Sequence, residues 1–120
     1  MSVNVLLADD SKTMRTIIRR SLEALGISSV TEAADGVEAV NLFQQQFDLV
    51  LTDWNMPNKS GLEVIQEIRS RNWQVPIIMI TTEAERRQIL RAIEAGVTDY
   101  LVKPFETDTL RDKLLKHGCN

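Results

Sequence analysis

The sequence has little of what would cross-link or divide a chain. Its 120 residues include one cysteine, Cys119, so neither an internal disulfide nor a cysteine-based metal site can form within it. This scarcity suits a reducing compartment, and we expect a cytoplasmic protein. No serine-, glycine- or proline-rich linker, long-period repeat or low-complexity segment interrupts the chain. With 43% hydrophobic residues, the sequence predicts one domain over residues 1–120.

Two further absences concern the partners. No apolar run approaches the roughly 20 residues that a bilayer-spanning helix needs, and the N-terminus lacks the basic-then-apolar pattern of a signal peptide. The formal net charge is -3, whereas a dedicated nucleic-acid binder carries a basic surface. We therefore predict neither a membrane nor a nucleic-acid partner, and we expect a monomer.

The sequence does contain a regular alternation of apolar runs and amphipathic stretches. Short apolar runs predict strands at residues 5–8, 49–53, 77–80 and 100–102, and residues 29–33 are typical of a further short strand. Helical periodicity and end signals predict helices at about residues 11–25, 36–43, 60–71, 86–95 and 107–117. This alternation indicates an α/β domain in which helices cover both faces of a five-stranded parallel sheet.

The helix ends and faces carry specific expectations. Asp10 or Ser11 should cap the first helix, and Thr107 should cap the last. The pairs with capping-box spacing are Asp35 with Glu38 and Ser60 with Glu63. The apolar stripes expected to face the core from the first and fourth helices are Met14, Ile17, Ile18, Leu22 and Leu25, and Ile89, Ala92 and Ile93.

Four of the five predicted strands end on polar side chains at the same edge of the sheet. In chain order these residues are Asp9, Asp10, Asp53, Thr81 and Lys103. Ligands of open parallel sheets bind beyond the carboxyl ends of the strands. Each residue alone has an ordinary alternative role, as an Asx turn, a helix cap or a solvated lysine. Their convergence on one edge indicates a functional site.

The residue types at this edge suggest phosphoryl chemistry. Neighbouring carboxylates repel one another unless a cation offsets their charge, and Mg²⁺ is commonly held by one or two carboxylates, which makes Asp9 and Asp10 candidate ligands. An aspartate can accept a phosphoryl group, and Asp53 is the candidate nucleophile. Lys103 and Thr81 would contact the phosphoryl oxygens, because phosphoryl transfer depends on positioning and positive charge.

These residues resemble the receiver domains of two-component response regulators, and in particular the single-domain chemotaxis type. The motifs that carry the resemblance span nearly the whole chain and are Asp9-Asp10, the run Asp-Trp-Asn-Met-Pro at 53–57, Thr81, and Lys103-Pro104-Phe105. The resemblance implies a flavodoxin-like, CheY-like sheet of order 2-1-3-4-5. It also implies that the phosphohistidine of a sensor histidine kinase phosphorylates Asp53. Mg²⁺ would be held by Asp10, Asp53 and the Asn55 carbonyl, with Asp9 acting mainly through water.

The same resemblance implies how the signal is tuned and passed on. Asn55 and Glu83 would flank the phosphoryl group and influence its hydrolysis, while Thr81 and Tyr100 would move together as a switch. The protein would not be a conventional enzyme, but would catalyse its own phosphorylation and dephosphorylation. Its output partner would be a protein such as a flagellar motor switch component, and a phosphatase would be a further partner.

Two expectations concern the C-terminal part of the chain. The resemblance implies a cis peptide bond between Lys103 and Pro104, which would aim the lysine into the site. His117 is the only histidine, and we expect it to lie in a frayed terminal turn without a functional role.

Three alternative functions use the same features. A phosphorelay intermediate would pass the phosphoryl group between two histidine proteins, and the sequence does not separate it from a receiver with its own output. A haloacid-type phosphatase would need a second aspartate two residues after the nucleophile, where this chain has Asn55. A nucleotide or flavin binder would need a phosphate-binding loop, but residues 9–14 lack its glycines.

Overall fold

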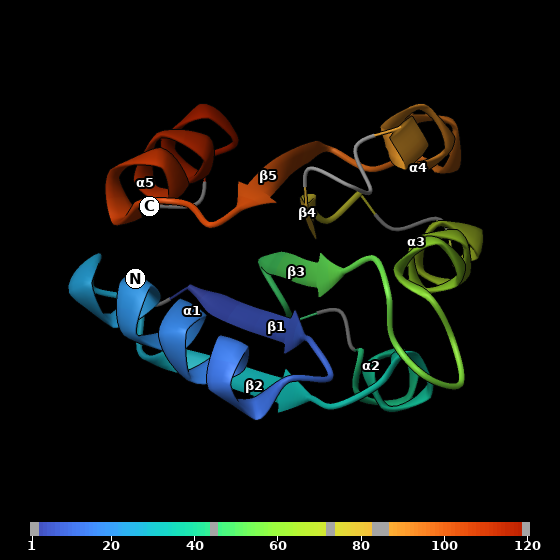
Figure 1. Ribbon diagram of the computed structural model, residues 1–120, viewed down its shortest axis with the longest axis horizontal. Coiled ribbons are helices and arrows are strands. Elements are labelled where there is room, and N and C mark those ends of the chain that lie inside the picture. Colours follow the sequence, from blue (N-terminus) through green and yellow to red (C-terminus); the bar gives the residue numbers. More distant parts are fainter. Residues whose placement is uncertain (1–2, 44–45, 72–73, 83–86, 119–120) are drawn as a thin grey trace.

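The computed structural model describes residues 3–43, 46–71, 74–82 and 87–118, which alternate between strands and helices (Figure 1). In chain order the elements are β1 (Asn4–Ala8), α1 (Lys12–Ala24), β2 (Ser29–Ala33), α2 (Gly36–Leu42), β3 (Leu49–Asp53), α3 (Gly61–Ser70), β4 (Ile77–Thr82), α4 (Ile89–Ala95), β5 (Asp99–Lys103) and α5 (Thr107–Lys116). Within the described ranges, no helix has the length and apolar character needed to cross a bilayer.

The strands form one parallel sheet in the order β2-β1-β3-β4-β5, which confirms the expected α/β fold. β3 lies at the centre of the sheet and is buried along its whole length. α1 and α5 cover one face of the sheet, and α2, α3 and α4 cover the other (Figure 1). The chain adds β2 on one side of β1 and β3 on the other. In a sheet of this kind, that reversal opens a crevice beyond the carboxyl ends of β1 and β3.

Each face of the sheet has its own hydrophobic core. Leu6 and Val50 belong to the cluster that includes residues of α2, α3 and α4. Their neighbours Leu7 and Leu51 belong to the cluster that includes residues of α1 and α5. Successive strand residues point to opposite faces, so a sheet covered on both sides requires an unbroken apolar run.

Three residues expected to face the core from helices are exposed instead, and one of them is Val37 of α2, at 37%. Ile17 of α1 is 49% exposed and Ile93 of α4 is 54% exposed. In α1 the buried residues are Ile18 and Leu22, and in α4 the buried residue is Ala92. The predicted stripes were therefore too wide. Periodicity finds the centre of a helix face, but each residue advances by about 100° around the axis, so the edge of that face depends on the neighbouring elements.

The first and third helices begin as predicted. Ser11 is the N-cap of α1, and its hydroxyl accepts a hydrogen bond from the Met14 amide at 3.2 Å. Ser60 and Glu63 form a complete capping box at the start of α3. These contacts satisfy amide groups that have no partner inside the helix.

The second and fifth helices differ from the prediction. Asp35 caps α2, but the Glu38 carboxylate accepts a hydrogen bond from the Ala34 amide at 2.9 Å, so the expected reciprocal box is only half formed. α5 begins at Thr107, and its N-cap is Glu106, without a side-chain cap hydrogen bond. The prediction of Thr107 as the cap was therefore wrong by one residue.

The C-terminal end of α5 is tied to the sheet. His117 Nε2 lies 2.8 Å from Asp99 Oδ2, and Lys113 Nζ donates to Asp99 Oδ1 at 2.9 Å. The His117 side chain is 17% exposed. The expectation of a frayed turn around His117 was wrong, because its partner is the first residue of β5 and lies 18 positions earlier in the chain.

Candidate functional site

The carboxyl ends of β1 and β3 bring three carboxylates together. Asp9 directly follows β1, Asp10 is the next residue, and Asp53 is the last residue of β3. Ala8 of β1 pairs with Thr52 of β3, and the next residues along these two parallel strands are Asp9 and Asp53. The two aspartates therefore lie at the same height along the sheet. Oxygens of the three carboxylates all lie within 4.8 Å of one another.

The burial of these groups favours a bound cation. Asp9 is 1% exposed and Asp53 is 6% exposed, whereas Asp10 lies at the surface. Asp9 Oδ1 accepts a hydrogen bond from the Ser11 amide at 2.8 Å, but Asp9 Oδ2 accepts none from any described residue. A buried carboxylate oxygen without a donor is unfavourable, and a hard divalent cation would satisfy it. The three carboxylates therefore fit Mg²⁺.

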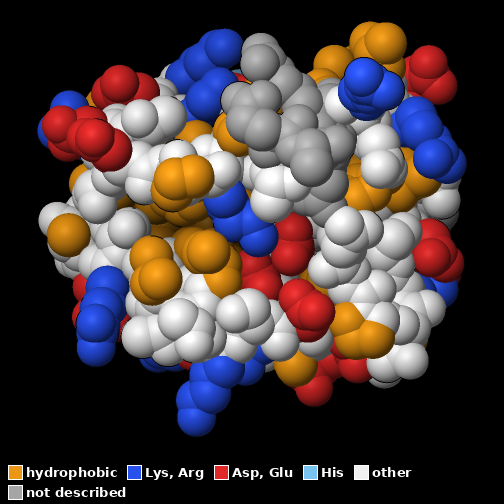
Figure 2. Space-filling model, viewed as in Figure 1, with side chains coloured by type: hydrophobic (Ala, Val, Ile, Leu, Met, Phe, Trp, Pro, Cys, Tyr) orange, Lys and Arg blue, Asp and Glu red, His pale blue; other side chains and the backbone are white. Residues whose placement is uncertain are grey.

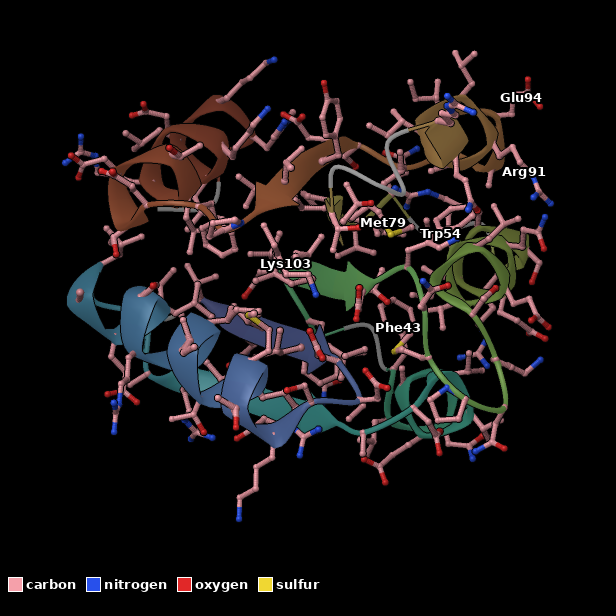
Figure 3. All side chains as sticks on the ribbon, viewed as in Figure 1. Phe43, Trp54, Met79, Arg91, Glu94 and Lys103 are labelled. Atoms are coloured by element: carbon pink, nitrogen blue, oxygen red, sulfur yellow. The ribbon has the colours of Figure 1, made fainter. Side chains whose placement is uncertain are left out.

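Lys103 extends from the end of β5 toward this cluster (Figure 3). Its Nζ lies 3.4 Å from Asp53 Oδ1 and 3.6 Å from Asp9 Oδ2. The Lys103–Pro104 peptide bond is cis, as expected. Figure 2 shows basic and acidic side chains meeting near the centre of the face in view. Lys103 thus supplies a positive charge to two buried carboxylates.

The surroundings of Asp53 raise its pKa to about 6. Burial is the main cause, because a low-dielectric environment disfavours the charged form, and the neighbouring Asp9 carboxylate adds to the effect. Lys103 and the Trp54 amide act in the opposite direction, and that amide donates to Asp53 Oδ1 at 2.8 Å. A strongly perturbed acid beside charged partners in a crevice is typical of functional sites.

Thr81 and Asn55 lie at the same edge of the sheet. Ile80 pairs with Asp53 across β3 and β4, so Thr81 is one residue further along β4. The Thr81 side chain is buried, and its hydroxyl donates to the Thr82 carbonyl at 3.3 Å. Asn55 is exposed two residues after Asp53, in the loop that leads to α3.

Gly61 positions the site, although its sequence context gave no sign of this beyond the adjacent Ser60 cap. A Cβ atom at Gly61 would lie 2.2 Å from the backbone oxygen of Asp53, closer than any side chain can approach. The Gly61 amide also donates to the Trp54 carbonyl at 2.8 Å. Glycine therefore lets α3 begin directly against the end of β3.

Both predicted switch residues are described, Thr81 on β4 and Tyr100 on the adjacent β5. Tyr100 is partly buried in β5, and Lys113 Nζ lies 5.3 Å from the centre of its ring. Tyr100 pairs with Met79, two residues before Thr81 on the adjacent strand. Tyr100 and Lys113 also line a groove of about 420 Å³ between β5 and α5. Glu83 lies outside the described residues.

Comparison with known proteins identifies the family. The model of the response regulator receiver domain matches residues 5–115. The chain belongs to the response-regulator receiver family. The receiver is 44% identical to chemotaxis protein CheY1 of Helicobacter pylori, over 93% of this chain and 94% of that protein.

Solved receiver structures agree with this identification. The fold is similar to that of Vibrio cholerae chemotaxis protein CheY4, with a TM-score of 0.87, 34% identity and coverage of 97% and 98% of the two chains. It is equally similar to the receiver domain of sensor histidine kinase PA1611 from Pseudomonas aeruginosa PAO1, with a TM-score of 0.87, 33% identity and coverage of 98% and 99%. As a receiver domain, the chain is a component of two-component signalling.

Proposed function

We propose that this receiver accepts a phosphoryl group on Asp53 from the phosphohistidine of a sensor histidine kinase, in a reaction that depends on Mg²⁺. Residues 1–120 would act as one receiver domain. The observation that carries it is the buried Asp53 carboxylate, which has Asp9 and Asp10 oxygens within 4.8 Å and Lys103 Nζ at 3.4 Å. Asp10, Asp53 and the Asn55 carbonyl would hold the ion, and Asp9 would act mainly through water.

The transfer exchanges one bond to phosphorus for another. A carboxylate oxygen of Asp53 attacks phosphorus while the bond to the histidine nitrogen breaks, and the bonding electron pair stays with that nitrogen. When bound, Mg²⁺ offsets the negative charge on the phosphoryl oxygens. The Lys103 ammonium contacts one of these oxygens, and the Thr81 hydroxyl donates to another. Water then attacks the aspartyl phosphate to reset the receiver, at a rate that Asn55 and Glu83 influence.

The choice of metal has two supports. Asp9 Oδ2 is buried and accepts no hydrogen bond from the described residues, so a cation has an oxygen to bind. The similar receiver domain of PA1611 carries a magnesium ion coordinated in its active-site cleft. Carboxylates and phosphoryl oxygens are the ligands that Mg²⁺ prefers.

Phosphorylation with a small donor tests the proposal. Acetyl phosphate and Mg²⁺ should add one phosphoryl group to the wild type in intact-mass analysis, and Asp53→Asn and EDTA should each abolish the addition. Asp108→Asn is the matched control, because this aspartate is 75% exposed on α5 and should not affect labelling. Equal labelling of wild type and Asp53→Asn would refute the assignment of Asp53.

The pathway that this receiver serves is a further part of the proposal. The similarity to chemotaxis proteins CheY1 and CheY4 supports a role in chemotaxis, in the cytoplasm, with an output partner such as a flagellar motor switch component. A phosphatase would shorten the signal. The phosphorylated receiver should bind the switch component more tightly than the unphosphorylated receiver does, and affinity measurement in the presence of acetyl phosphate checks this.

A second candidate function is that of a phosphorelay intermediate. It is favoured by the similarity to the receiver of PA1611, which is itself part of a sensor histidine kinase. A relay receiver returns its phosphoryl group to a histidine. Loss of label from phosphorylated receiver to an added histidine phosphotransfer domain would support this function, whereas hydrolysis to inorganic phosphate without transfer supports direct output.

A further inference from the structure

Arg15, in the first turn of α1, connects the acidic site to a neighbouring strand. Its Nη1 donates to the backbone carbonyl of Asp9 at 2.6 Å, and its Nε donates to Glu32 Oε1 of β2 at 3.0 Å. The Arg15 side chain is only 14% exposed. A guanidinium presents several donors in a rigid plane, so it can hold both acceptors at once.

The carbonyl that Arg15 binds belongs to the peptide between Asp9 and Asp10. That peptide is planar, so a bond to its oxygen fixes the orientation of the whole unit. The neighbouring backbone is also held, because the Asp9 amide donates to the Ala33 carbonyl at 3.1 Å and the Ser11 amide donates to Asp9 Oδ1 at 2.8 Å. Three hydrogen bonds thus hold the turn that carries Asp9 and Asp10, and Arg15 donates one of them.

Asp10 depends on this support more than Asp9 does. Asp9 is buried and has a hydrogen bond of its own, whereas the exposed Asp10 side chain makes no hydrogen bond or ion pair with any described residue. The backbone therefore decides where the Asp10 carboxylate lies.

Glu32 is shared between two arginines, which gives an internal comparison. Arg19 Nη1 pairs with Glu32 Oε2 at 2.5 Å, and Arg19 Nε lies 3.6 Å from Glu23 Oε1. Among the described residues, the polar partners of Arg19 are Glu32 and Glu23, and it makes no hydrogen bond to the Asp9 backbone. The two arginines thus have the same charge and the same carboxylate partner, but only Arg15 donates a hydrogen bond to the turn that carries Asp9 and Asp10.

We propose that Arg15 is a positioning residue of the metal site: by orienting the Asp9–Asp10 peptide, it places the Asp10 carboxylate where a divalent cation can use it. This inference rests on the proposed function. A positive charge near a divalent cation weakens cation binding, whereas a positioning hydrogen bond strengthens it. Removing Arg15 therefore separates the two effects by the direction of the change in affinity.

Metal binding to Arg15→Met and Arg19→Met tests the inference. Electron paramagnetic resonance measures free Mn²⁺ directly, and Mg²⁺ competition converts the result to Mg²⁺ affinity, without phosphorylation. Arg15→Met should bind about 10-fold more weakly than wild type, the loss typical of groups that orient metal ligands. Arg19→Met should bind as wild type or slightly more tightly. Equal affinity of the two variants, or tighter binding by Arg15→Met, would overturn the inference.

If Arg15→Met does not fold, the Mn²⁺ affinity of Arg15→Lys tests the inference instead. A lysine retains the charge, but its single nitrogen cannot bind both the Asp9 carbonyl and Glu32 in the geometry of the guanidinium. It should bind Mn²⁺ several-fold more weakly than wild type, and wild-type affinity would overturn the inference. Failure of the wild type to bind Mn²⁺ would instead reject the proposed metal-dependent function, so the two failures are distinguishable.

Discussion

At the scale of single residues, the site concentrates negative charge that the metal-free protein only partly neutralises. Lys103 lies within ion-pair distance of Asp9 and Asp53, but one ammonium cannot offset three carboxylates. The raised pKa of Asp53 reflects this imbalance and its burial. A metal-free receiver should therefore be less stable than the same fold without the Asp53 charge.

Asp53→Asn should stabilise the metal-free receiver in a pH-dependent way. The pKa of Asp53 is about 6 in the folded protein against an ordinary value of 3.8, so the folded state binds the proton more tightly and stability falls as pH rises from about 4 to about 6. At pH 7 in EDTA, we expect the variant to unfold on the order of 4 °C or more above wild type. Near pH 4 the difference should nearly vanish.

Thermal unfolding in EDTA at both pH values measures this difference. Asp108→Asn, which removes an exposed charge of α5, should show little change at either pH. If Asp53→Asn raised the unfolding temperature by the same amount at pH 4 and pH 7, titration of Asp53 would not be the cause of the stabilisation.

The site residues on strand ends could be predicted from sequence, because topology alone brings the ends of parallel strands to one edge. Gly61, Arg15 and His117 could not. Gly61 is required by close approach to the Asp53 carbonyl, Arg15 acts on the Asp9 carbonyl, and His117 pairs with Asp99 across 18 residues. Each role depends on a contact that exists only after folding.

At the scale of elements, the sequence predicted the positions of the strands more accurately than the buried faces of the helices. β1, β3 and β4 are apolar runs that are buried on both faces and end at or just before a polar residue, so the run itself marks the strand. A helix is buried over only part of its circumference. Ile17 and Ile93 lie beside the buried stripe, and the packing of neighbouring elements, which periodicity does not contain, leaves them exposed.

The junction between β5 and α5 is an electrostatic contact between elements. The Asp99 carboxylate contacts His117, Lys113 and, at 3.9 Å, Lys116 near the C-terminal end of α5. Burial alone would raise the pKa of Asp99, but hydrogen bonds from His117, Lys113 and the Tyr100 amide lower it to about 2. The ionised Asp99 therefore helps to hold α5 on the sheet.

Asp99→Asn should remove stability at neutral pH but not in strong acid. Because the folded pKa lies below the ordinary 3.8, the contribution of Asp99 is fully present above about pH 4 and is lost as pH falls toward 2. The shift corresponds to roughly 2 kcal/mol. Urea unfolding at pH 6 should show the variant less stable by about this amount, and the two proteins should converge near pH 2. A stability difference independent of pH would show that Asp99 acts through packing alone.

At the scale of the whole molecule, α4, β5 and α5 combine into a surface remote in sequence from Asp53. Leu90 and Ile93 of α4 are 70% and 54% exposed, and Tyr100 and Lys113 border the groove between β5 and α5. Exposed apolar side chains and a groove are both features that suit a partner helix or peptide. Because β4 and β5 are adjacent strands, we propose that Thr81 and Tyr100 connect this surface to the site.

Phosphorylation should change this surface through Thr81 and Tyr100. The hydrogen bond from the Thr81 hydroxyl to the Thr82 carbonyl is 3.3 Å long, so a charged phosphoryl oxygen on Asp53 offers a stronger acceptor. As Thr81 moves toward it, Tyr100 should swing inward to fill the space, since its ring is apolar and its present site only half-buried. Beryllofluoride, which mimics the phosphoryl group, should therefore shift NMR signals of α4 and β5 as well as those around Asp53.

Thr81→Val separates binding of the mimic from transmission of the signal. Valine keeps the size of threonine but cannot donate a hydrogen bond, so Asp53 should still respond to beryllofluoride while the shifts at Tyr100 and along α4 are largely lost. Ser70→Ala is a matched loss of a hydroxyl, which donates to the Glu67 carbonyl within α3, and should leave the wild-type response intact. Full shifts at Tyr100 in Thr81→Val, or none in wild type, would show that the coupling follows another route, because the Thr81 hydroxyl is the group that this mechanism requires to move.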